Sequence, residues 1–219
     1  MMTLLRKYKF PLEWPFWVQQ VVGGKFQGAN FPDFSDSVTL HTIQQNANLC
    51  YIDVTPNEIG DYKYVRYLSA KGGYNNMAEV QFYSGGKRLN GEVIGTEGTT
   101  DKIYTHHTKY AVFDGDPLSY YFAIEADSGW AGLAFDQRYP IEAIRYIFRN
   151  DDNNVRPGDR YELLYQRNRQ WISAGIQTAD TTLLIYDKVP SNTLYWLRNH
   201  TRGKEERPFI YVDGKQVFY

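Results

Sequence analysis

Residues that often carry catalysis are present in this 219-residue chain, but their spacing indicates no catalytic site. The single cysteine, Cys50, and the nearby His41 fall on separate predicted strands and match no nucleophile motif. The adjacent pair His106-His107 would point to opposite faces of a strand, which is poor geometry for a shared zinc ion. The pair Asp151-Asp152 lacks a partner acid at the spacing that glycoside hydrolysis requires. We therefore expect a protein that is not an enzyme, and a glycoside hydrolase is the least favoured alternative.

The aromatic side chains are the other group of residues that could bind a ligand. They form 16% of the chain, with 19 Tyr, 12 Phe and 5 Trp. Aromatic rings favour half-buried strand surfaces, and exposed rings also serve as stacking platforms for sugars. We expect most of these rings in a β core, so the aromatic content alone assigns no binding site.

Charge and hydropathy argue against two classes of partner. The formal net charge of -1 gives no global basic field for neutralising the phosphates of a nucleic acid. No stretch reaches the ~20 consecutive apolar residues that span a bilayer, and no export signal is visible. We therefore expect neither a nucleic-acid partner nor a membrane span, and the single cysteine rules out an intrachain disulfide.

Short runs rich in Val, Ile, Tyr, Phe and Thr alternate with glycine-containing turns along the whole chain, and long helical periodicity is nearly absent. The Gly85-Gly86 pair between two such runs predicts a tight hairpin. Many short strands at this spacing predict an all-β fold, either a sandwich or a barrel. The predicted strands are residues 21–30, 38–43, 64–68, 79–83, 130–135, 143–148, 160–165, 183–186, 193–198 and 208–212.

An internal repeat suggests how the chain divides. Residues 63–87 and residues 194–215 each contain two strand-like runs joined by a long loop, and each ends in Gly-Lys. We interpret both copies as the same pair of antiparallel strands closing a module. This places a boundary near Asn90-Gly91, after an N-terminal tail (1–20) and a short module (21–90) and before a larger module (91–219). Because unpaired strand edges are a liability, the N-terminal segment is expected to pack on the first module.

Much of the chain resembles the discoidin domain, also called the F5/8 type C or galactose-binding-like domain. The turn Asp114-Gly115-Asp116 followed by Ser119 is the most telling part of the resemblance. The resemblance implies an antiparallel jelly-roll β-sandwich, complete in residues 91–219 and partial in residues 21–90. It is carried by residues 25–43, 93–96, 110–119, 129–133, 141–146, 158–165, 170–171 and 194–198.

The same resemblance implies a biological context. Residues 149–154 and 198–207 are similar to discoidin-like modules appended to larger cell-surface proteins of Bacteroides-type bacteria. This implies a non-catalytic carbohydrate-binding module, accessory to a larger cell-surface or glycan-processing protein, with a glycan as ligand and upstream catalytic domains as partners. The implied location is extracellular, periplasmic or at the cell surface. The alternative is a structural or protein-interaction spacer without a small-molecule ligand.

A structural calcium ion near the Asp-Gly-Asp turn is also implied by the resemblance. The matching positions are Asp114, Asp116 and Ser119, with Glu206 from the last part of the chain, although the repeat leaves Glu205 as an alternative. Ser119 stands where the family usually has threonine. Carboxylate and carbonyl oxygens suit Ca²⁺, which takes six to eight oxygen ligands. An ordinary Asp-Gly turn without a metal is the competing interpretation.

The family binds its ligands on loops at one end of the sandwich. Sugar recognition requires an aromatic face together with planar hydrogen-bonding groups. For each single candidate, a solvated loop or an internal hydrogen bond is the competing interpretation. The three tryptophans Trp130, Trp171 and Trp196 are expected to pack in the core rather than to stack on a ligand. The candidate ligand residues are His106, Tyr121, Arg149, Asn150, Asp151, Asn199 and Arg202.

Overall fold

The chain folds into antiparallel β-sheets, as the strand pattern predicts, and it divides into two compact units. Unit 1 comprises Met1–Leu12 and Asn150–Tyr219, and unit 2 comprises Glu13–Arg149. Among the described residues, η1 (Lys109–Val112) is a short 3-10 helix, and no helix is long and apolar enough to cross a membrane. The computed structural model describes residues 1–5, 7, 20–45, 51–99, 107–127, 129–150, 155–201 and 206–219.

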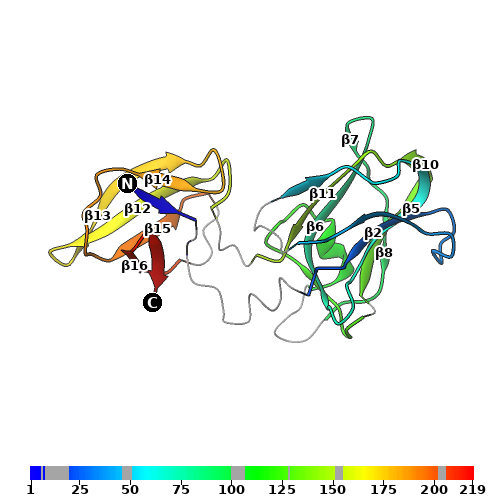
Figure 1. Ribbon diagram of the computed structural model, residues 1–219, viewed down its shortest axis with the longest axis horizontal. Coiled ribbons are helices and arrows are strands. Elements are labelled where there is room, and N and C mark those ends of the chain that lie inside the picture. Colours follow the sequence, from blue (N-terminus) through cyan, green and yellow to red (C-terminus); the bar gives the residue numbers. More distant parts are fainter. Residues whose placement is uncertain are drawn as a thin grey trace. The chain divides into compact units, whose positions relative to one another are not determined.

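The first sheet of unit 2 has five antiparallel strands (Figure 1). In its central strand β5, Val65 and Tyr67 are fully buried while Tyr64 and Arg66 are partly exposed, which is the period of two that a strand with one core face requires. In spatial order the strands are β3 (Val38–Thr42), β2 (Lys25–Ala29), β5 (Asp61–Leu68), β10 (Trp130–Pro140) and β8 (Glu92–Gly95).

The second sheet of unit 2 also has five strands, and one of them lies off the main path of the sheet. Its longest strand, β6, pairs with β11 in the antiparallel register that sets Phe82 opposite Ile144. Aromatic side chains from both sheets fill one core. The ring centroid of Phe26 lies 5.1 Å from that of Tyr67 and 4.8 Å from that of Tyr146. Unit 2 is therefore sandwich-like. The strands are β4 (Ile52–Val54), β11 (Ala143–Phe148), β6 (Asn75–Ser84) and β7 (Lys87–Arg88), with β9 (Tyr121–Phe122) paired to β6.

The boundary expected near Asn90-Gly91 falls inside unit 2 and is corrected by the structure. Strands that precede it pair with strands that follow it, as in the pairing of Val65 with Leu133 and of Phe82 with Ile144. The two halves share one core, so neither half is a module. The repeat describes local strand-loop-strand segments, and such local similarity carries no information about which distant strand completes the sheet.

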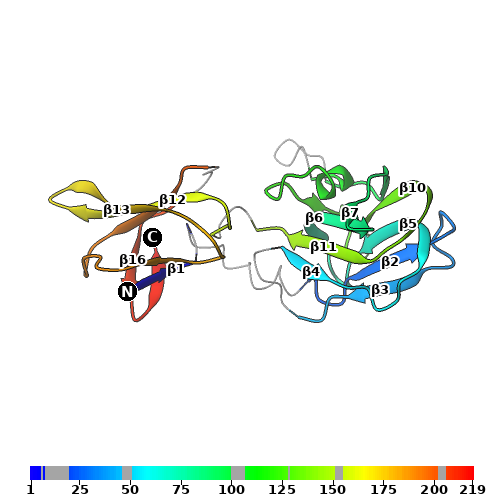
Figure 2. The ribbon, with the colours of Figure 1, turned by 90° about the horizontal axis from the view of Figure 1, so that it is seen from above.

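Unit 1 is built from a five-stranded sheet and a two-stranded sheet (Figure 2). Strand β1 (Met2–Leu4) pairs with β14 (Leu184–Tyr186), so these N-terminal residues belong to unit 1 and not to the first expected module. Met2 and Leu4 are buried in one cluster with Tyr161, Leu163 and Leu197 of the larger sheet. In spatial order the strands of that sheet are β13 (Gln170–Thr178), β12 (Arg160–Arg167), β15 (Tyr195–Asn199), β16 (Phe209–Val212) and β17 (Lys215–Phe218).

Candidate functional site

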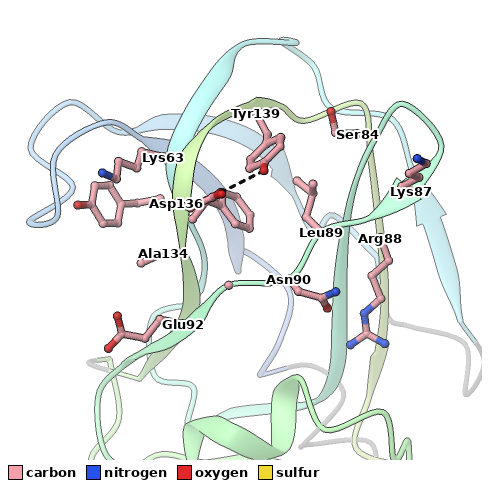
Figure 3. A pocket seen from close by; sticks show the side chains of 13 residues that line it. Lys63, Ser84, Lys87, Arg88, Leu89, Asn90, Glu92, Ala134, Asp136 and Tyr139 are labelled. Atoms are coloured by element: carbon pink, nitrogen blue, oxygen red, sulfur yellow. Dashed lines mark hydrogen bonds between the residues drawn. The ribbon is translucent and has the colours of Figure 1, made fainter.

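A cleft of about 840 Å³ in unit 2 is a candidate ligand site. Figure 3 shows Lys63, Asp136 and Tyr139 on one side of it and Ser84, Lys87 and Arg88 on the other. The segment that carries Asn90 and Glu92 runs between the two sides. The cleft thus combines aromatic, amide, carboxylate and cationic side chains in one concave surface.

An irregularity in strand β10 creates the aromatic side of the cleft. Ala134 pairs with Tyr64 and Tyr139 pairs with Tyr62, so the β10 residues between them have only Lys63 opposite them. Extra residues in one strand bend it and redirect its side chains, and such bulges are common beside functional sites. The backbone irregularity therefore releases Asp136 from the regular ladder and allows it to line the cleft together with Tyr139.

The ring of Tyr139 is held by a hydrogen bond from its hydroxyl and by a contact with the ring of Phe135. Its hydroxyl donates a hydrogen bond to Asp136 Oδ1 over 3.1 Å, and the same oxygen accepts from the backbone N–H of Gln137 over 2.9 Å. The ring meets the buried Phe135 edge-on, with ring centroids 5.6 Å apart. A ring fixed in this way loses little conformational freedom when a ligand stacks on it.

Three glycines shape the opposite wall and the floor. Gly85 and Gly86 have φ values of 55° and 72°, as a tight hairpin between β6 and β7 requires, and the pairing of Tyr83 with Arg88 confirms that predicted hairpin. At Gly91 an added Cβ would lie 2.5 Å from the backbone oxygen of Ala134, so only glycine lets the floor approach β10 this closely. The hairpin and Gly91 are close together in the sequence, but they form a cleft only because β10 supplies the opposite side.

Arg88 joins the cleft to a buried carboxyl group. Its Nη2 atom lies 3.6 Å from Glu79 Oε2 and donates to the backbone oxygen of Phe113 over 3.4 Å. Glu79 is fully buried and accepts from the backbone N–H of Gly115 over 2.6 Å. Burial raises the pKa of Glu79 to about 7, and the nearby carboxylate of Asp114 also raises it, while the hydrogen bond from Gly115 and the charge of Arg88 lower it.

Three of the four expected calcium ligands come together in one turn of unit 2. Asp114 Oδ1 accepts from the backbone N–H of Asp116 over 2.8 Å, and Asp116 Oδ1 accepts from Leu118 over 2.9 Å. The Ser119 hydroxyl lies within hydrogen-bonding distance of three oxygens, namely Asp114 Oδ2 at 2.8 Å, the Asp116 carbonyl at 3.0 Å and the Ala111 carbonyl at 3.2 Å. The Ser119 hydroxyl has a single proton and donates it to only one of these oxygens at a time. The other two oxygens then accept no hydrogen bond from Ser119.

Glu206, the fourth expected ligand, belongs to unit 1 and is engaged there. Its Oε1 atom accepts from the backbone N–H of Asn199 over 2.7 Å, and its Oε2 atom lies 3.9 Å from Arg198. The glutamate that reaches the turn within unit 2 is Glu79, because the strand beside the turn is β6. The residues that the structure describes contain no group of three or more His, Cys, Asp or Glu arranged to hold a metal ion.

Two of the expected ligand residues lie in unit 2, away from the cleft lining. Tyr121 is fully buried, and its hydroxyl lies 2.7 Å from the Thr96 hydroxyl, which is an internal contact. The guanidinium of Arg149 lies 4.1 Å from the ring centre of Tyr120, and its backbone N–H donates to the Asn76 carbonyl over 3.0 Å. His106, Asp151 and Arg202 lie outside the described residues.

Asn150 and Asn199, the other expected ligand residues, are buried in unit 1. Asn150 accepts a hydrogen bond from the guanidinium of Arg156. The Asn199 amide donates to Asp159 Oδ2 over 2.8 Å, and its oxygen accepts from the backbone N–H of Thr201 over 2.8 Å. Both side chains therefore make internal hydrogen bonds, which was the competing interpretation for each of them.

The residues of the cleft were missed because sequence reasoning sought ligand contacts only in the loops of the second expected module. A signal was present in the polar stretch Asp136-Gln137-Arg138, which interrupts the apolar alternation after Phe135 and coincides with the register shift in β10. Comparisons of the chain with protein-family models, with curated proteins and with solved structures found no match. The geometry of the chain itself is therefore the basis for assigning a function.

Proposed function

We propose that the chain is a non-catalytic carbohydrate-binding module of the discoidin-like, jelly-roll type, and that it binds a glycan in the cleft of unit 2. The observation that carries the proposal is the fixed Tyr139 ring, hydrogen-bonded to Asp136 on the wall of the cleft. A sugar ring presents C–H groups that pack against an aromatic face and hydroxyls that need directional partners. The cleft offers both kinds of contact side by side.

The size and charge of the cleft support a saccharide as ligand. Its volume of about 840 Å³ falls in the range of roughly 300–1,000 Å³ typical of small-ligand sites. Its three cationic side chains, Lys63, Lys87 and Arg88, exceed the carboxylates of Asp136 and Glu92 by one charge, so the lining favours no strongly charged ligand. Asn90 adds an amide, which is able both to donate to and to accept from a hydroxyl.

The experiment is a glycan-array screen of the full chain, followed by calorimetric titration of each glycan that binds. Tyr139→Ala removes the stacking ring and is expected to weaken binding by about tenfold or more, as loss of an aromatic contact residue does. Tyr110→Ala is the matched control, because Tyr110 is exposed in the same unit and does not line the cleft. Glycan binding that is unchanged by Tyr139→Ala would refute the proposed site.

Calcium is the second element of this proposal. Asp114 Oδ2 and the carbonyl oxygens of Ala111 and Asp116 all lie within hydrogen-bonding distance of the Ser119 hydroxyl. Together with that hydroxyl they are the hard oxygen donors that Ca²⁺ prefers. A bound ion would satisfy these acceptors together and stiffen the turn beside Glu79, which contacts the cleft residue Arg88. An ordinary turn that is complete without metal is the alternative.

Thermal denaturation in CaCl₂ and in EGTA distinguishes the two. A metal site predicts a higher melting temperature in calcium that Asp114→Asn abolishes, because a ligand that binds only the folded state stabilises it. Asp127→Asn, which changes an exposed carboxylate elsewhere in unit 2, is the matched control. Identical melting curves with and without calcium would leave the turn without a metal.

A structural spacer without a small ligand remains the second candidate. The observation that favours it is the engagement of Asn150 and Asn199 in internal hydrogen bonds, which removes them from ligand binding. This candidate predicts that no glycan on the array binds the wild-type chain. As a binding module, by contrast, the chain would serve as the accessory part of a larger cell-surface or glycan-processing protein, joined to catalytic domains.

A further inference from the structure

The outer face of the five-stranded sheet of unit 1 carries two of the three tryptophans that the sequence assigned to the core, Trp171 and Trp196. The antiparallel register places directly opposed residues on the same face of a sheet. The core side chains Tyr161, Leu163 and Leu197 all lie on one face, so their strand neighbours lie on the other. The outer face consists of the rows Trp171 with Gln166, Ser173 with Leu164 and Trp196, and Ile176 with Glu162 and Arg198.

The tryptophans form an exposed pair on this face. Trp171 is 37% exposed, Trp196 is partly buried, and their ring centroids lie 5.7 Å apart at 66°. Neither side chain belongs to the apolar core cluster of unit 1. The expectation that both pack in the core is therefore wrong, because the core lies on the opposite side of the strands that carry them.

Packing alone does not account for Trp196. Its indole N–H is enclosed and has no hydrogen-bond acceptor within the described part of the chain. Leaving a buried donor unpaired costs free energy, and a buried indole N–H normally finds a partner. A leucine or phenylalanine would cover Leu164 on this face without that cost, so the aromatic character of the position needs another explanation.

Hydrogen-bonding side chains surround the ring pair and neutralise one another. His200 Nε2 lies 2.9 Å from Glu162 Oε2, and a hydrogen bond from Ser173 holds the pKa of Glu162 below its ordinary value, with His200 adding to the shift. The guanidinium of Arg198 lies 5.3 Å from the ring centre of Trp196, and its Nε atom is 3.9 Å from Glu206. The face therefore offers planar donors and acceptors without a net field that would select an anion or a cation.

The dimensions of the face favour a small ligand over a protein. Neighbouring strands lie about 4.8 Å apart, so the five strands of this sheet span about 19 Å, and three same-face residues along a strand span about 14 Å. The resulting area, on the order of 270 Å², is well below the roughly 800 Å² that each partner contributes to a stable protein interface. It suits a short chain of sugar rings.

We propose that this surface, defined by Trp171, Trp196, Glu162, Arg198 and Ser173, binds a neutral oligosaccharide that stacks on the tryptophan rings. It is a second binding site, on a different unit from the cleft, and it does not depend on the cleft for any residue. The side chains around the rings hydrogen-bond the sugar hydroxyls. The ligand is an extended chain, because the rows of the face run across neighbouring strands.

The experiment titrates the full chain with gluco-, manno-, xylo- and galacto-configured hexasaccharides and follows tryptophan fluorescence and heat of binding. Trp171→Ala is expected to weaken the affinity of the bound hexasaccharide by about tenfold or more, and Trp171→Phe to restore much of it. Ile185→Ala is the matched control, since Ile185 is 45% exposed on β14, outside the tryptophan face. Far-ultraviolet dichroism and melting curves verify that each variant is folded.

A crossed design separates this site from the cleft. In a Tyr139→Ala background the tryptophan face retains its hexasaccharide, whereas Trp171→Ala retains whatever glycan the cleft binds. The proposal is overturned if no hexasaccharide binds the wild type, or if Trp171→Ala leaves the affinity unchanged. It is also overturned if sedimentation shows a wild-type dimer that Trp171→Ala converts to a monomer, because the face would then be an interface between copies of the chain.

Discussion

The hydroxyl of Tyr139 donates a hydrogen bond to Asp136 over 3.1 Å, within the irregular stretch of β10 that faces Lys63 of β5. This contact orients an aromatic ring and a carboxylate toward the same cleft. The register of β10 with β5 shifts between Ala134 and Tyr139, and in this stretch Phe135 and Asp136 line the cleft instead of pairing with β5.

The contact between Tyr139 and Asp136 predicts coupled effects on glycan affinity. Tyr139→Phe keeps the ring and removes the hydroxyl, and Asp136→Ala removes the acceptor. Each change alone is expected to reduce affinity by about 2–10-fold, since a hydrogen bond contributes about 0.5–1.5 kcal/mol. In a double-mutant cycle measured by calorimetry, the combined variant should lose less than the sum of the two. Strict additivity would show that the pair does not act as a unit.

Gly91→Ala is expected to destabilise unit 2. The new Cβ would lie 2.5 Å from the Ala134 carbonyl and 3.0 Å from the Phe135 ring, so the backbone would have to move. Overpacking of this kind typically costs about 1–3 kcal/mol of unfolding free energy. Urea denaturation measures it, with the neighbouring exposed residue in Asn90→Ala as the control, expected to change stability by less than about 0.5 kcal/mol. Equal stability of the two variants would contradict the close approach.

The buried carboxyl of Glu79 predicts a stability that falls as the pH rises. Burial raises its folded-state pKa from the ordinary 4.5 to about 7. Below the ordinary value the acid is protonated in both states, and above about 7 the folded state must hold a buried charge. The contribution lost is at most about 3 kcal/mol. Urea denaturation in EGTA from pH 5 to pH 8 should therefore show declining stability in the wild type.

Glu79→Gln isolates this titration, because glutamine keeps the shape and an oxygen for the Gly115 N–H but does not ionise. The difference in unfolding free energy between wild type and variant should change with pH mainly between about 4.5 and 7. A difference that is constant across this range would mean that Glu79 titrates at its ordinary pKa in the folded protein.

Two separate cores predict local effects of core truncation. Leu163 is fully buried in the core of unit 1, and Leu133 is buried in that of unit 2. Leu163→Ala is expected to cost about 2–5 kcal/mol and to speed amide exchange in β12 and β15 while leaving β5 and β10 protected. Leu133→Ala should have the reverse effect. Equal loss of protection in both units after either change would show one cooperative unit.

The amino-acid sequence by itself determined the local elements of this protein. Alternating burial in runs such as residues 64–68 follows from the order of the side chains, because a strand with one core face requires a period of two. The Gly85-Gly86 hairpin was likewise predictable, since both residues take the positive φ that this turn demands. The turn from Asp114 to Ser119 was found from residue types, because its hydrogen bonds are local.

Only the tertiary structure decided which strands meet. The pairing of Phe82 with Ile144 joins segments that are far apart in the chain. A local sequence repeat does not predict which distant strand pairs with its own strands. Tertiary packing likewise placed Glu79, and not Glu206, beside the Asp114 turn. It also decided which face of β13 and β15 is covered, and so placed Trp171 outside a core in which its residue type alone would have put it. Side-chain order sets the two faces of a strand, but distant contacts choose the buried one.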